Sequence, residues 1–295
     1  MSVVKTPNWR RLFESGPLFL KGSFTASRIG SFLFLSFTGL LVLFPLLMAL
    51  LNSFKTTAEM NQAVMALPRT FNFNNYVTAF QSMRFLHSAL NTFVITVCST
   101  FGIVLFSSMA GYKLSRTKTV LSNVIFFLII SSMMIPFSVI MIPLVKVSAQ
   151  LHILNKIWGV ILVYIGVGIN MPIFLYHGFV KTIPQEVEEA ALIDGASYWQ
   201  SFRKIIFPML QPINITVALL QIIWIWNDFM LPLVFISNQN NYTLILSTQS
   251  FYTLYSTSWE LILAGNFMAV IPVIVVYLIF QKNIQEGIAT GALKG

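Results

Sequence analysis

Six long runs of mainly apolar residues constrain the fold of this chain more than any other feature. They cover residues 29–51, 88–110, 121–145, 157–178, 212–236 and 261–280. About 20 apolar residues are enough for a helix to span the hydrocarbon core of a bilayer, where every backbone N–H and C=O must be paired within the protein. The sequence therefore predicts an all-α, polytopic membrane protein with six transmembrane helices.

The composition agrees with a membrane protein. Of the 295 residues, 56% are hydrophobic and 9% are charged, whereas about 25% of the residues in soluble domains are charged. The first apolar run is too long for a cleaved signal peptide, and no small-x-small cleavage site follows it, so we expect it to remain as an anchor. Cys98 is the only cysteine and the three histidines are scattered, so we expect neither a disulfide nor a metal site.

The basic residues indicate how the chain is oriented. With the N-terminus in the cytoplasm, only Lys55, Arg69, Arg84, Lys146 and Lys156 fall outside. Excess Lys and Arg in cytoplasmic loops is the usual signature of orientation, so both termini are predicted to be cytoplasmic. The same distribution accounts for the net charge of +9 without nucleic-acid binding.

The spans divide the chain into three parts. Residues 1–28 are predicted to form a cytoplasmic tail, residues 29–280 the transmembrane domain, and residues 281–295 a second cytoplasmic tail. In the outer loop 52–87 we expect a short helix at about 75–82. Helix-breaking residues should bend several spans, namely Pro136, Pro143, Gly166, Gly168, Pro172, Pro232 and Pro272.

The polar stretch at about 182–208, between the fourth and fifth spans, contains the signals of two short helices. Thr182 and Gln185 fit a capping box at the start of the first helix. Glu186, Glu188 and Glu189 follow, where the helix dipole favours anions. We call residues 182–208 the EAA loop.

The second helix of the EAA loop is predicted to start directly after a tight turn. Gly195 supplies the left-handed residue that ends the first helix, and Ser197 with Gln200 fits a second capping box. Trp199, Phe202 and Ile206 recur at helical spacing and should form an apolar stripe, and Pro208 should end this helix.

The EAA loop also carries a spaced motif. Glu189-Ala190-Ala191 is followed after three residues by Gly195, and after nine more by Ile205-Ile206-Phe207-Pro208. This pattern resembles the coupling loop of the permeases of ABC importers, E-A-A-x3-G-x9-I-x-L-P, and Phe207 in place of Leu is its one departure. The alternative is an amphipathic helix pair lying on lipid headgroups, which would not require the full spacing.

In that family the loop docks into a cleft of an ATPase subunit. The resemblance implies that the contact or its attachment to the fifth span involves Glu189, Ala190, Ala191, Asp194, Gly195, Ile205 and Pro208. The chain has no G-x-x-x-x-G-K-[ST] phosphate loop. We therefore expect no enzymatic activity and no cofactor in this chain, with ATP and Mg bound by separate ATPase subunits.

Two further segments resemble carbohydrate permeases of the maltose-transporter G-subunit type. They are the stretch from Trp226 to Leu233 and the tail from Gly287 to Gly295. The resemblance implies the type I importer-permease fold in a bacterial cytoplasmic membrane. It also implies a second, homologous but non-identical permease, two ATPase subunits and an extracellular sugar-binding protein. Gly291 and Lys294 would contact the ATPase, and the polar segment 237–260 would meet the binding protein.

Polar and aromatic residues in the fourth and fifth spans are candidates for the substrate path. They are Asn170, Gln221, Trp224, Trp226, Asn227 and Asp228. A carboxylate within a span usually faces a bundle interior or a watery cavity. Asp228 would therefore bind sugar hydroxyls or make a structural bond between helices, and we favour the structural bond because an uncharged sugar needs no ionised partner.

Three alternatives to a sugar importer stay open. An ABC importer for another solute would share the EAA loop but differ in the tail and fifth-span patterns. An ion-coupled secondary transporter would need ionisable residues within its spans, where Asp228 is the one candidate. A membrane scaffold without transport activity is the third.

Overall fold

The computed structural model describes residues 26–252 and 257–292, and these form helices, turns and loops with no named β-strand. The chain divides into two compact units, residues 1–49 and 50–295. The all-α prediction is confirmed for the described residues.

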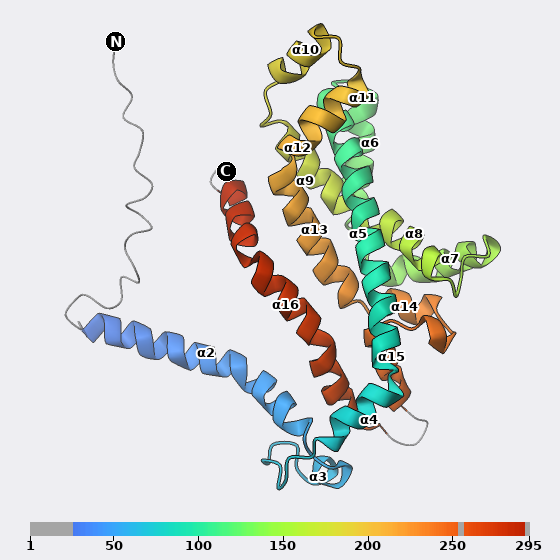
Figure 1. Ribbon diagram of the computed structural model, residues 1–295. Helices are drawn as coiled ribbons and strands as arrows, with labels where there is room; N and C mark the ends of the chain where they lie inside the picture. Colours follow the sequence, from blue (N-terminus) through green and yellow to red (C-terminus); the bar gives the residue numbers. More distant parts are fainter. Residues whose placement is uncertain (1–25, 253–256, 293–295) are drawn as a thin grey trace. The chain divides into compact units, whose positions relative to one another are not determined.

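The helices are short in the loops and long in the apolar runs (Figure 1). The first half of the chain contains α2 (Ala26–Asn52), α3 (Thr57–Gln62), α4 (Asn74–Ser82), α5 (Phe85–Arg116), α6 (Val120–Ser132), α7 (Phe137–Gln150), α8 (Ile157–Gly168) and α9 (Asn170–Val180). The second half contains α10 (Glu186–Ile193), α11 (Tyr198–Ser201), the π-helix η1 (Phe202–Ile206), α12 (Phe207–Met209), α13 (Gln211–Trp226), α14 (Met230–Phe235), η2 (Gln239–Asn241), α15 (Leu244–Ser247), η3 (Thr248–Phe251) and α16 (Trp259–Ala292).

Three helices are long and apolar enough to cross a membrane, and they lie within α2, α5 and α16. Three further candidates are bent pairs: α6 with α7 at 104°, α8 with α9 at 49°, and the stretch Tyr198–Met209 with α13 at 74°. If each pair is one span, the described residues hold up to six candidate spans. They lie at the positions of the apolar runs except the fifth in chain order, which begins at Tyr198, within the EAA loop, and ends at Trp226 instead of at 236.

Proline and glycine account for several of the breaks. Pro136 is the N-cap of α7, Gly168 ends α8, and Pro172 lies in the first turn of α9. Proline suits a first helical turn because its missing N–H has no partner there. Pro143 and Pro272, by contrast, lie inside continuous helices, where neighbouring groups can satisfy the freed carbonyl.

Helix α5 is the centre of the larger unit and packs along α8, α9 and α13. The approach of α5 to α9 requires Gly111, because a Cβ at this position would lie 2.5 Å from the Cβ of Tyr176 and 3.0 Å from the backbone nitrogen of His177. Tyr176, Ile206 and Leu210 are fully buried in a cluster where α9, η1 and α13 meet. This cluster connects the EAA loop to the apolar helices.

The described part of the polar segment 237–260 packs on α5. Leu244, Leu246 and Phe251 are buried, and the Thr92 hydroxyl of α5 accepts a hydrogen bond from the Leu244 N–H at 2.7 Å. The short helix predicted at 75–82 is confirmed as α4. Helix α3 was not predicted, although its capping box of Thr56 and Glu59 is visible in the sequence.

Candidate functional site

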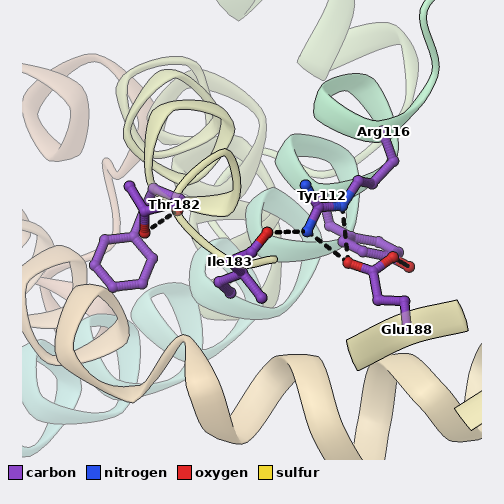
Figure 2. A network of polar contacts seen from close by, with 6 residues as sticks. Tyr112, Arg116, Thr182, Ile183 and Glu188 are labelled. Carbon is purple, nitrogen blue, oxygen red and sulfur yellow. Dashed lines mark hydrogen bonds and ion pairs between the residues drawn. The ribbon is translucent and has the colours of Figure 1, made fainter. Parts of the chain in front are cut away.

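The Gly195 turn divides the EAA loop into a first arm before it and a second arm after it, and the first arm ends in helix α10. The predicted capping box at Thr182 is wrong: α10 begins at Glu186, and its N-cap Gln185 makes no side-chain cap. The Thr182 hydroxyl instead donates to the carbonyl oxygen of Phe179 at 2.8 Å (Figure 2), and the same oxygen accepts the backbone N–H of Thr182 at 2.9 Å at the end of α9. Glu186, Glu188 and Glu189 lie in the first turn of α10, as predicted.

The turn after α10 has the predicted geometry. Gly195 has a φ of 85°, and the N–H of Ala196 donates to the carbonyl of Ala191 at 3.0 Å. The second capping box is also confirmed: the N–H of Gln200 donates to the Ser197 hydroxyl at 3.2 Å, and the Gln200 side chain accepts from the Ser197 N–H at 2.8 Å. The chain therefore reverses between two short helices.

The second arm differs from the prediction in its helix type and its end. After α11 the backbone widens into the π-helix η1, and Pro208 lies inside α12 rather than ending the helix. Phe202 and Ile206 are buried as the apolar stripe requires, while Trp199 is 53% exposed and stacks on Phe202. The break before α13 falls at Leu210, followed by Pro212 in the first turn.

Most of the predicted contact residues lie on the outside of the EAA loop. Glu189, Ala190, Asp194, Gly195 and Pro208 are exposed, whereas Ile205 is half-buried and Ala191 is buried. The side chain of Ala191 thus packs within the chain, and Ala190 faces outward.

Two large exposed residues beside the Gly195 turn were not predicted. Ile193 is 85% exposed and Tyr198 is 77% exposed. The sequence could have indicated them, because Ile193 and Tyr198 are large apolar or aromatic residues on either side of a predicted polar turn. A loop without a partner would have no need for such residues. Together with the exposed motif residues they form a face of small, apolar and acidic groups.

A polar network ties the EAA loop to the last turn of α5 (Figure 2). Arg116 pairs with Glu188 at 2.6 Å and donates to the carbonyl oxygen of Ile183 at 2.8 Å. The Tyr112 hydroxyl donates to the other oxygen of Glu188 at 2.8 Å. We call Tyr112, Arg116 and Glu188 the α5 clamp. Sequence reasoning missed it because Arg116 and Glu188 are 72 positions apart.

The substrate-path candidates separate into buried and exposed groups. The Trp226 indole N–H donates to the Ala269 carbonyl at 3.0 Å, and Asp228 accepts from the Tyr164 hydroxyl at 2.9 Å. Both make bonds between segments of the chain, as the structural interpretation of Asp228 expects. Gln221 is also buried.

The remaining substrate-path candidates are more open. Trp224 is 40% exposed with its ring edge-on to Tyr164. Asn227 is exposed and Asn170 half-buried. Of the two predicted tail contacts, Gly291 lies in α16, and Lys294 lies outside the described residues.

Comparison with known families gives one match over most of the chain. Residues 103–290 match the model of the family described as "Binding-protein-dependent transport system inner membrane component". This range begins within α5 and contains the whole EAA loop and both residues that clamp it from α5.

Several characterised or named proteins are similar over nearly their full length. The chain is 39% identical to the probable starch degradation products transport system permease protein AmyC of Thermoanaerobacterium thermosulfurigenes, over 86% of this chain and 93% of that protein. It is 35% identical to the multiple sugar-binding transport system permease protein MsmG of Streptococcus mutans, over 89% and 96%. It is 30% identical to the arabinooligosaccharides transport system permease protein AraQ of Bacillus subtilis, over 92% and 98%.

A solved structure has the same fold. It is a bacterial ABC transporter involved in the import of the acidic polysaccharide alginate, and the match has a TM-score of 0.72 over 95% of this chain and 99% of that chain. At 23% identity this likeness concerns the fold alone.

Proposed function

Because the chain belongs to the family of binding-protein-dependent transport system inner membrane components, we propose that it is the membrane permease subunit of an ATP-driven importer for a sugar or oligosaccharide. As a member of this family it is a membrane component of an ABC transport system and not an enzyme. The sugar class is supported by the names of AmyC, MsmG and AraQ, which refer to starch products, multiple sugars and arabinooligosaccharides.

We propose six spans with both termini in the cytoplasm of a bacterium. The apolar runs and the distribution of Lys and Arg support this topology. The importer would contain a second, related permease, two ATPase subunits that bind ATP and Mg, and an extracellular sugar-binding protein. The family description supports the binding protein as a partner.

The observation that carries the proposed mechanism is the exposed face of the EAA loop. Glu189, Ala190 and Gly195 are exposed beside the projecting side chains of Ile193 and Tyr198. Small residues and a glycine turn allow close approach of another protein, and exposed apolar groups gain stability when such a partner covers them. Closure of the ATPase subunits would push this face, and the spans would switch from inward-facing to outward-facing and back. We also propose that the α16 tail, through Gly291 and Lys294, meets the ATPase.

For the substrate path we propose Trp224, Asn227 and Asn170 ahead of the buried candidates. An indole face suits the apolar face of a sugar ring, and amides pair with hydroxyls. Trp226, Gln221 and Asp228 are buried or already bonded within the chain, so sugar could reach them only after the helices rearrange.

The testing experiment is ATP hydrolysis by the purified importer in nanodiscs, with candidate binding proteins loaded with maltotriose, arabinotriose or raffinose. Stimulation by one loaded binding protein, lost in Gly195→Pro, is the expected result. Proline cannot adopt the φ of 85° at this position. Failure of any ATPase subunit to copurify, with uptake that follows an ion gradient, would show the proposal to be wrong.

A further inference from the structure

The last turn of α5 holds both arms of the EAA loop. Tyr112 and Arg116 are four residues apart and so lie on the same face of α5. The Arg116 guanidinium donates to one oxygen of Glu188 at 2.8 Å and to the Ile183 carbonyl. The Tyr112 hydroxyl binds the other Glu188 oxygen, and its ring packs on Phe202 with centroids 5.3 Å apart. One helical turn therefore contacts the entry to α10 and α10 itself (Figure 2), and through Phe202 it also contacts the second arm.

The clamp is shielded from solvent more than an ordinary surface ion pair. The side chains of Arg116 and Glu188 are 14% and 13% exposed. A charge withdrawn from water is destabilising unless its partner stays in place, so removing either member leaves the other uncompensated. The pair thus specifies a single position for α10 against α5.

The apolar contacts of α10 are limited to one buried side chain, Ala191, and the half-buried Val187 and Leu192. Of the eight residues of this helix, Ala191 is the buried one, and its side chain is small. The clamp is accordingly the main side-chain connection described between α10 and a long apolar helix. The chain connects the loop to α13 by a different route, through η1 and α12.

Helix α5 is placed to receive a push from α10. Directly before the clamp, the absence of a side chain at Gly111 lets α5 lie against Tyr176 and the backbone of His177 in α9. A displacement of α10 applied through Glu188 would therefore reach α5 next to its contact with α9.

We infer that Tyr112, Arg116 and Glu188 are positioning residues that transmit the movement of the EAA loop to α5. This inference rests on the proposed function, since it concerns the same loop. It assigns to α5 a share of the coupling that the EAA motif does not contain, because Glu188 precedes the motif and the other two residues lie on a different helix.

A double-mutant cycle in the intact importer tests the clamp. The variants are Arg116→Met, Glu188→Gln and the pair together, and the matched controls are Lys113→Met and Glu186→Gln, which remove exposed charges from the same two helices. The amount of ATPase subunit that copurifies is measured first. ATP hydrolysis and sugar uptake are then measured in proteoliposomes, with the binding protein loaded with the sugar that stimulates the wild type.

The expected result is a change in the ratio of sugar imported to ATP hydrolysed. Each single clamp variant should lower this ratio about five- to tenfold, in the range of typical allosteric couplings, and the double variant should be no worse than the singles. ATPase copurification and the two controls should match the wild type. Unchanged ratios in both single variants, or fully additive losses, would overturn the inference.

A distance measurement on the chain alone in nanodiscs separates this inference from the proposed function. Spin labels are placed at Lys118→Cys and Glu186→Cys in a Cys98→Ala background, at exposed sites beside the clamp. The wild-type clamp should give a narrow distance distribution and Glu188→Gln a broad one. Equal widths of the wild-type and Glu188→Gln distributions would overturn the inference about the clamp even if sugar import is found. A narrow wild-type distribution, together with no sugar uptake by the intact importer in proteoliposomes, would leave the clamp intact and reject the proposed function.

Discussion

The EAA loop and the polar segment 237–260 are both polar connections, but they are held in opposite ways. The described part of the polar segment is fixed by many hydrogen bonds and buries Leu244, Leu246 and Phe251. The EAA loop is fixed at the α5 clamp and a buried cluster, and it leaves Glu189, Ala190, Gly195 and Pro208 of its motif exposed. Both connections keep exposed residues, including residues 237–240 of the polar segment, so the polarity of the sequence does not indicate how a connection is held by the rest of the chain.

Asn155 illustrates how firmly the polar segment is held. Its side-chain oxygen accepts from the N–H groups of Ser237 at 2.6 Å and Asn238 at 3.0 Å, and its amide donates to the Ser237 hydroxyl. Its backbone carbonyl accepts from the Asn241 side chain. Asn155 has a φ of 58°, a left-handed conformation that Asn tolerates well.

The largest effect is expected from Asn155→Ala, which would loosen the polar segment until it resembles the EAA loop. The substitution removes three hydrogen bonds at about 1 kcal/mol each and adds strain of about 1 kcal/mol at a positive φ. Thermal unfolding in detergent should show a clear fall in midpoint. Asn155→Asp keeps the acceptor and is the control; equal stability of the Ala variant and the wild type would contradict the comparison.

A smaller loss of stability is expected from Thr92→Val. The buried N–H of Leu244 would lose its acceptor on α5, at a cost of about 1–3 kcal/mol. Thr96→Val is the matched control, because the Thr96 hydroxyl is buried on the same helix without a hydrogen bond to the described residues. Denaturation should separate the two variants, and identical stability would show that the bond to the polar segment contributes nothing.

On the EAA loop, Tyr198→Ser should leave stability within about 0.5 kcal/mol of the wild type, as is usual for exposed sites. Tyr198 is 77% exposed, so its loss opens no cavity. The proposed partner contact should weaken instead, with less ATPase subunit retained on the purified permease. A less stable variant that retains the ATPase subunit normally would contradict the comparison, because Tyr198 would then stabilise the chain and not bind a partner.

The smallest effect concerns pH and the loop before α4. The pKa of the Glu59 carboxyl lies below its ordinary value because the backbone N–H groups of Thr56 and Arg69 donate to it. Because the pKa is lower in the folded form, the ionised carboxyl stabilises the fold at pH values above the unfolded pKa of 4.5. This stabilisation is lost as the pH falls from 4.5 through the lower pKa of the folded form. The protection factors for amide hydrogen exchange at α3, which are corrected for the intrinsic pH dependence of exchange, should therefore fall in acid, and Glu59→Gln should remove this fall.

Local signals predicted the parts of the structure that depend on neighbours in sequence. The apolar runs are helical, Gly195 is left-handed, and Ser197 caps a helix with Gln200. Each of these depends on a few adjacent residues, so a single sequence carries the information. The family resemblance, confirmed by the comparisons, added the fold and the class of transporter.

What was missed depends on partners far away in the chain. Thr182 has the right spacing for a cap, but its hydroxyl pairs with Phe179 because α10 starts later. The α5 clamp and the bond between Tyr164 and Asp228 join segments that are 64 or more positions apart in the sequence. Spacing rules for one helix cannot predict such pairs.

The π-helix η1 gives a physical meaning to the length of the EAA motif. A π-helix accommodates one extra residue within an otherwise α-helical stretch, and η1 follows the Gly195 turn and includes Ile205 and Ile206 of the motif. Because the π-helix absorbs this residue, deleting one residue from Phe202–Ile206 would return the stretch to α-helical geometry with nearly the same rotation between α11 and α12. A deletion within a regular α-helix would instead rotate one side against the other by about 100°. The π-helix is thus the place where this part of the loop can lose a residue while its exposed groups keep their direction.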